Sequence, residues 1–169
     1  MILGFLLLQL APGYATDVAV GRLLQGEVLV KTELMDTPFL EISLRESNDS
    51  LWSLLPSSSN RKDLKLLVLA NRPWKLIIKD ADPETSGRLT EWNGQEYTNT
   101  QLSYPLTVVG SKRVVLPNLA NVPVQTGGPT GPQGRDINIS LEQEVSEVDS
   151  PLPPGSIYYI KMSFTLAAE

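Results

Sequence analysis

The chain has 169 residues, of which 41% are hydrophobic and 20% charged, a composition typical of a folded globular domain rather than a disordered segment. Cysteine and histidine are both absent, which excludes disulfides, thiolate nucleophiles and zinc sites built from these residues. The formal net charge of -5 disfavours nucleic acid and anionic membrane surfaces as partners.

The N-terminus carries an apolar run over residues 2–10, which a proline then interrupts. Small residues, Gly13 and Ala15, follow at the two positions that a signal peptidase reads. The run is too short to span a bilayer, and no Lys or Arg precedes it. We expect a secretory signal over residues 1–15, with a buried N-terminal strand as the alternative. The mature protein would then be a secreted or cell-surface domain over residues 16–169.

A short alternating strand follows, in which Thr16, Val18 and Val20 occupy every second position before a flexible Gly21. A strand tethered in this way can pair within its own domain or add to the open edge of a neighbour's sheet. Head-to-tail exchange does not close on itself and would build a fibre. The sequence leaves both modes open, and pairing within the domain is the commoner one for a first strand in a sandwich.

The middle of the chain predicts a series of strands. Residues 40–44 alternate apolar and polar side chains, which indicates a strand with one solvated face. The run 64–69 is apolar on both faces and is expected in the centre of a sheet. A turn at 71–73 leads into a return strand that begins at Trp74, and we expect the two strands to form a pair. We expect the Trp74 indole to lie between two sheets.

The later part of the chain continues the pattern. Asn93 and Gly94 predict a two-residue hairpin turn between strands at 88–92 and 95–98. The clearest strand is 156–167, with an apolar residue at every second position. Further strands are expected at 106–109, 114–116, 137–141 and, as an edge piece, 122–124. Roughly eight to ten short strands without a helical pattern predict an all-β, antiparallel, Ig-like β-sandwich.

Trp74-Lys75-Leu76 opens a strand in the middle of the chain, and Phe164-Thr165-Leu166 lies just before its end. This pair of segments resembles the WxL-type surface domains of Gram-positive bacteria, in which the second segment also begins with tryptophan. The layout is also similar to secreted fibre subunits of the TasA or archaeal pilus kind, which join by strand exchange. The resemblance implies an exported β-sandwich.

An acidic loop is the one candidate for a metal site. Asp80, Asp82 and Glu84 alternate as do the first oxygen ligands of a calcium loop. Thr85 stands where the tight-turn glycine of such a loop belongs, so a solvated acidic turn is the favoured interpretation. Apart from this calcium ion, we expect no cofactor.

Two kinds of surface site are also indicated. Trp92 and Tyr97 border the Asn93-Gly94 turn, where exposed aromatic rings could contact a sugar such as a cell-wall polysaccharide. Packing of these rings across the hairpin is the favoured interpretation, because aromatic residues on paired strands also stabilise the hairpin itself. Asn48 and Asn138 each begin an Asn-x-Ser triplet, the acceptor pattern for N-glycosylation, and Asn48 lies at a predicted turn.

No pattern in the chain favours catalysis, since it contains no nucleophile motif, phosphate loop or histidine. We therefore expect a non-catalytic, exported structural or adhesive protein of the cell surface, for which a fibre subunit that assembles by strand addition is one form and a monomer with its first strand paired in its own domain is the other. Its partners would be copies of itself or other cell-surface proteins. The alternative is a carbohydrate-binding module that uses the hairpin tip of Trp92 and Tyr97.

Overall fold

The computed structural model describes residues 19–20, 30–31, 39–45, 52–56 and 58–169. The chain divides into two compact units, Met1–Thr37 and Pro38–Glu169. Within the first unit the described residues form one antiparallel strand pair, β1 (Ala19–Val20) with β2 (Val30–Lys31), in which Val20 is the partner of Val30. The predicted signal segment lies outside the described residues.

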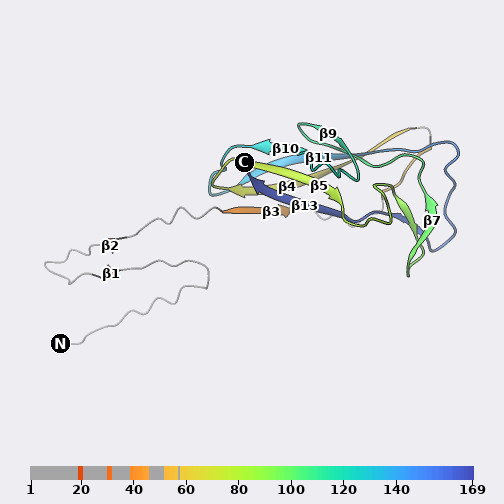
Figure 1. Ribbon diagram of the computed structural model, residues 1–169, viewed down its shortest axis with the longest axis horizontal. Coiled ribbons are helices and arrows are strands. Elements are labelled where there is room, and N and C mark those ends of the chain that lie inside the picture. The colour runs from red at the N-terminus through yellow and green to blue at the C-terminus, as the bar shows by residue number, and fades with distance from the viewer. Residues whose placement is uncertain (1–18, 21–29, 32–38, 46–51, 57) are drawn as a thin grey trace, which may run out of the picture. The chain divides into compact units, whose positions relative to one another are not determined.

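The second unit is built from three antiparallel sheets (Figure 1). The largest has five strands in the order β3 (Leu40–Leu44), β4 (Ser59–Ala70), β11 (Arg135–Glu144), β8 (Thr107–Val109) and β9 (Arg113–Val115). The second has three strands in the order β10 (Gln125–Gly127), β5 (Trp74–Asp80) and β13 (Met162–Ala168). The third joins β12 (Ile157–Tyr159), β6 (Thr90–Trp92) and β7 (Tyr97–Gln101).

These sheets confirm the predicted all-β, antiparallel, sandwich-like fold, and the described residues contain no helix. The central position predicted for residues 64–69 is also confirmed, because β4 pairs with β3 on one side and with β11 on the other. The described residues form thirteen strands, more than the roughly eight to ten expected from turn spacing, because several are only two or three residues long.

The core lies between the five-stranded sheet and the three-stranded sheet formed by β10, β5 and β13. Alternate residues of β4, β5, β8 and β11 point into it and are almost fully buried: Leu66, Val68, Leu76, Ile78, Val108 and Ile139. Trp74 is 1% exposed, and its indole Nε1 donates a hydrogen bond to the carbonyl of Gly128 at 2.9 Å. The indole therefore packs in the core, as the sequence predicts, with its polar atom satisfied.

The predicted strand 156–167 is wrong in one respect, because the structure divides it between two sheets. β12 pairs with β6, whereas β13 pairs with β5, and the chain crosses over at Ile160 and Lys161. The alternation itself is confirmed, since Ile160, Met162 and Phe164 pack against the core. The two-residue period does not reveal a change of sheet, because the same face of the strand stays apolar on both sides of the crossover.

Three further predictions need correction. Residues 122–124 do not form a strand; Val124 is buried, its N–H donates to the carbonyl of Leu76 at 2.8 Å, and β10 begins one residue later. The strand after the turn at 71–73 does not pair with the strand before it, because β4 and β5 belong to different sheets. The predicted two-residue hairpin turn is a four-residue loop, since Trp92 pairs with Tyr97.

Candidate functional site

One side of the sandwich ends in two edge strands. β3 is the edge of the five-stranded sheet and β13 the edge of the three-stranded sheet, and the two strands contact each other. β3 covers only part of β4, from Ala70 to Leu66. The first half of β4 therefore has no strand beside it on this side within the described part of the chain.

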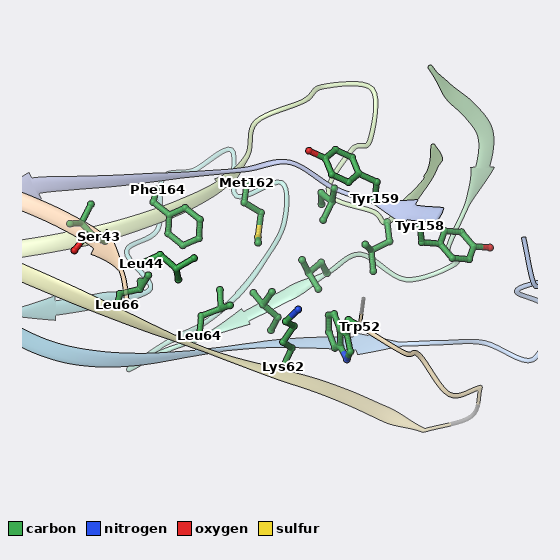
Figure 2. A pocket seen from close by; sticks show the side chains of 15 residues that line it. Ser43, Leu44, Trp52, Lys62, Leu64, Leu66, Tyr158, Tyr159, Met162 and Phe164 are labelled. Carbon is green, nitrogen blue, oxygen red and sulfur yellow. The ribbon is translucent and has the colours of Figure 1, made fainter. Parts of the chain in front are cut away.

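An apolar groove of about 670 Å³ opens between these edges (Figure 2). Its volume lies within the range of pockets that bind ligands or apolar segments. Phe164 and Met162 reach into it from β13, and Leu64 and Leu66 face them from β4 (Figure 2). The remaining lining residues are Ile42, Ser43, Leu44, Trp52, Lys62, Leu89, Leu106, Leu141, Tyr158, Tyr159 and Ile160.

The groove leaves apolar side chains incompletely covered. Met162, Phe164 and Leu166 are half-buried, although their alternation would suit a fully covered face. Leu44, at the end of β3, is 48% exposed. Full burial of an exposed apolar side chain of this size is worth about 1.5–3 kcal/mol, and completing the burial of a half-buried one gives part of that, so an additional segment placed here would be stabilised by contact.

The backbone of β13 offers hydrogen-bonding groups on the same side. The carbonyl of Lys161 accepts a bond from Ala81 N–H at 2.8 Å, and the N–H of Glu169 donates to the carbonyl of Pro73 at 3.0 Å. The backbone N–H and C=O groups of the odd-numbered residues therefore point to β5. By the two-residue period, those of Met162, Phe164 and Leu166 point to the other edge of the strand. No described strand pairs with that edge.

The residues predicted for strand exchange are only partly described. Val20 lies in β1, where it is the partner of Val30, whereas Thr16 and Val18 lie outside the described residues. The groove residues themselves were not recognised from the sequence as a site. Their alternation indicates a buried face, but whether a strand lies at an edge depends on the topology of the whole sheet.

A second feature is a cluster of three aromatic rings at the β6–β7 hairpin. The ring centroids of Trp92 and Tyr97 are 5.2 Å apart with the planes at 72°, an edge-to-face contact. Tyr159 joins from β12, with centroids 6.3 Å from Trp92 and 6.2 Å from Tyr97. The sequence signal missed Tyr159, because it stands on the polar face of the last predicted strand; the residue is 41% exposed.

Polar groups surround this cluster. Burial, followed by the charge of Asp82, raises the pKa of Tyr97 to about 12. Glu91 is buried behind the hairpin, and Thr98 Oγ1 donates to its Oε2 at 2.7 Å. Hydrogen bonds from Thr98 and Ser156 hold the pKa of Glu91 below its usual range. The hairpin therefore combines partly exposed rings with a fixed carboxylate.

The carboxylates of the acidic loop accept hydrogen bonds from other residues of the same loop. Asp80 Oδ2 accepts hydrogen bonds from Thr85 Oγ1 at 2.5 Å and from Gly87 N–H at 2.6 Å, and Asp82 Oδ1 accepts one from Glu84 N–H at 3.2 Å. The described residues contain no group of three or more acidic, His or Cys side chains that could hold a metal ion. The loop geometry thus has a structural explanation, and calcium binding gains no support from it.

Of the two glycosylation triplets, the one at Asn138 lies within the described residues. Asn138 lies on β11 as the partner of Lys65 and is exposed. Asn48 lies outside the described residues. Modification at either asparagine stays a prediction.

No protein-family model matches the chain, and no curated protein matches it either. Among the described residues there is no helix with the length and hydropathy needed to cross a membrane. The resemblance to WxL-type domains stays a prediction; its two segments lie on neighbouring strands, with Leu76 as the partner of Leu166.

Proposed function

We propose that this chain is a non-catalytic, exported structural or adhesive protein of the cell surface, whose copies join into a fibre by β-strand addition. The observation that carries the proposal is the open side of the sandwich, where the β13 edge lies above an apolar groove. Strand addition uses both features together: backbone hydrogen bonds give affinity, and alternate side chains fill the groove.

The sequence of the edge supports the same conclusion. Soluble proteins usually protect long edge strands with charged residues, proline or a bulge, because an open edge pairs readily with other chains. β13 has seven residues without a charge or a proline, and it is the longest edge strand among those described. An edge of this kind is suited to pairing with another strand.

The test compares two purified chains, one beginning at Thr16 and one beginning at Gly21, by light scattering over a range of concentrations. We expect only the longer chain to assemble, because the shorter one lacks β1. If both stay monomeric at high concentration, assembly by strand addition is refuted. Mass spectrometry of the protein from its native host tests export: a chain that begins at Thr16 supports it, and an intact Met1 contradicts it.

A second candidate function is carbohydrate binding at the hairpin. The observation in its favour is the cluster of Trp92, Tyr97 and Tyr159, since partly exposed rings stack on sugar faces. Titration with soluble cell-wall polysaccharide, followed by tryptophan fluorescence, tests it. A saturable signal that Trp92→Ala abolishes would support a binding module. A titration without any signal would contradict carbohydrate binding, and the structural role would then be the one proposal that stands.

A further inference from the structure

We propose that the aromatic cluster of Trp92, Tyr97 and Tyr159 binds a quaternary ammonium group, the kind of cation that choline carries. Such a ligand is small and positively charged, so its binding depends neither on strand addition nor on a sugar contact. Three features of the hairpin favour it: the spacing of the rings, the charge of the residues around them, and the hydrogen bonds already made there.

The three rings meet at an accessible place. One comes from each strand of the small sheet: Trp92 from β6, Tyr97 from β7 and Tyr159 from β12. The hairpin of β6 and β7 lies at one end of the second unit (Figure 1). Tyr159 is 41% exposed, and Trp92 and Tyr97 are partly exposed. A small solute can therefore reach the cluster from water.

The spacing of the rings suits a single cation. The centroids of the three rings lie between 5.2 and 6.3 Å apart. A cation is attracted to the face of an aromatic ring within about 6 Å of the ring centroid. One ammonium group placed over the middle of the cluster is therefore within reach of all three rings. A neutral sugar at the same place gains stacking area but no cation–π attraction.

Acidic residues dominate the sequence around these rings. The stretch 80–97 contains five carboxylates and one guanidinium group, that of Arg88. Arg88 Nη1 donates to the backbone carbonyls of Leu102 and Ser103, so its charge is directed to the chain itself. Lys161, which follows β12, adds one exposed positive charge. The local charge stays negative, and it attracts a cation and repels an anion.

Three of these carboxylates lie near Tyr97. Burial first, and then the charges of Asp82 and Asp80, raise the pKa of Tyr97 to about 12. Glu84 and Tyr97 line a cleft of about 490 Å³, together with Thr98, Asn99 and Gln101. Its volume lies within the range of pockets that bind small ligands. The cleft gives room beside the rings for the remainder of a ligand such as choline, and its amide and hydroxyl groups suit the alcohol of that ligand.

The hydrogen bonds of the acidic loop favour a cation that has no N–H group. Asp80 Oδ2 accepts hydrogen bonds from Thr85 Oγ1 and Gly87 N–H, and Asp82 Oδ1 accepts one from Glu84 N–H. A primary ammonium group brings three donors that need acceptors, whereas a quaternary ammonium group brings none. Negative charge and aromatic surface are what a quaternary ammonium group requires, and the hairpin supplies both.

Calorimetric titration of the full chain with choline chloride tests the inference. The matched ligand is the carbon isostere of choline, in which a neutral tert-butyl group replaces the trimethylammonium group. We expect saturable binding of choline, about tenfold tighter than binding of the isostere, because cation–π attraction requires the charge. The methyl resonance of bound choline should move to higher field in NMR spectra, since its methyl groups lie over ring faces. Equal affinity for the two ligands, or no binding of choline at millimolar concentrations, would overturn the inference.

Variants of Tyr159 test the location of the site, because this residue is exposed on β12, an edge strand of its sheet. Tyr159→Leu should weaken choline binding about tenfold, whereas Tyr159→Phe keeps the ring and should bind as the natural chain does. Asp82→Asn should also weaken binding, while Glu41→Gln, at an exposed position of the five-stranded sheet, should not.

Circular dichroism establishes that each variant is folded. Choline binding that Tyr159→Leu leaves unchanged would place the ligand away from the rings and overturn the inference. The comparison of choline with its isostere uses the natural chain, so it decides the question even if a variant fails to fold. Assembly by strand addition is measured separately by light scattering, and either proposal can fail while the other stands.

Discussion

At the scale of single residues, Trp74 and Trp92 show how the same residue type serves two different purposes. Trp74 is 1% exposed in the core, and Gly127 lies so close that a Cβ added to it would meet the indole at 2.5 Å. Trp92 is half-buried and packs against Tyr97 at the hairpin. The first ring stabilises the fold, whereas the second is partly available to a ligand.

We therefore expect Trp74→Ala to lower the free energy of unfolding by about 3–5 kcal/mol, the usual cost of removing a buried large aromatic side chain. Trp92→Ala should cost less than half as much, because part of its surface is already in water. Urea denaturation of the two variants measures both values. Equal losses would contradict the assignment of one ring to the core and the other to the surface.

Tyr97 provides a prediction about pH. Burial first, then Asp82 and Tyr159, raise the pKa of this phenol to about 12 in the folded protein, against about 10 in an unfolded chain. The folded state therefore holds the proton more firmly. Its contribution to stability is complete below pH 10 and is lost as the pH rises through about 12.

An absorbance titration of the phenol groups, with Tyr97→Phe as the reference, isolates this ionisation. The difference between the two titrations should have its midpoint near 12, well above that of an exposed tyrosine. A midpoint near 10 would show that Tyr97 is solvated and that the aromatic cluster is open.

At the scale of elements, much of the sandwich could be predicted because its strands alternate strictly. β3, β4, β5 and β11 all follow from the period of two, and burial on one face preserves that period. The crossover at Ile160 could not be predicted, because a strand that passes from one sheet to another keeps the same apolar face. The pairing of β4 and β5 with other strands is likewise a property of the topology.

The connection around Gly87 gives a prediction at this scale. Gly87 has φ of +78°, and a Cβ added there would lie 2.3 Å from the carbonyl carbon of Leu116. Gly94, in the hairpin loop, has φ of +95° with nothing within 4 Å of such a Cβ. A side chain at either position would strain the backbone because of the positive φ, but only at position 87 would it also clash with neighbouring atoms.

Gly94→Ala should therefore cost about 1–2 kcal/mol, the price of a left-handed conformation with a side chain. Gly87→Ala should cost about 2 kcal/mol more, because the backbone of the Leu116 connection has to move. Thermal or urea unfolding compares them. A similar loss in both variants would mean that the backbone at Leu116 moves at little cost in free energy, which would contradict the prediction.

At the scale of the whole molecule, the unequal sheets explain why the candidate site was hidden in the sequence. The apolar residues of β13 were predicted to be buried, and the N-terminal strand was predicted as a possible donor. The position of β13 at a sheet edge beside the groove follows only from the strand order. A pattern along the chain cannot indicate which strand has no neighbour.

Hydrogen exchange along β13 tests the central claim most directly, because the strand's two edges are distinguished residue by residue. The assembled and the dilute protein are exchanged in parallel, then dissolved and measured by NMR. The amides of Ser163 and Thr165 should be protected in both samples, since odd-numbered residues face β5. The amides of Phe164 and Leu166 should exchange quickly in the dilute protein and slowly in the assembly. Fast exchange of these two amides in the assembled protein, or slow exchange in the dilute monomer, would contradict the role of β13 as the edge that joins one copy to the next.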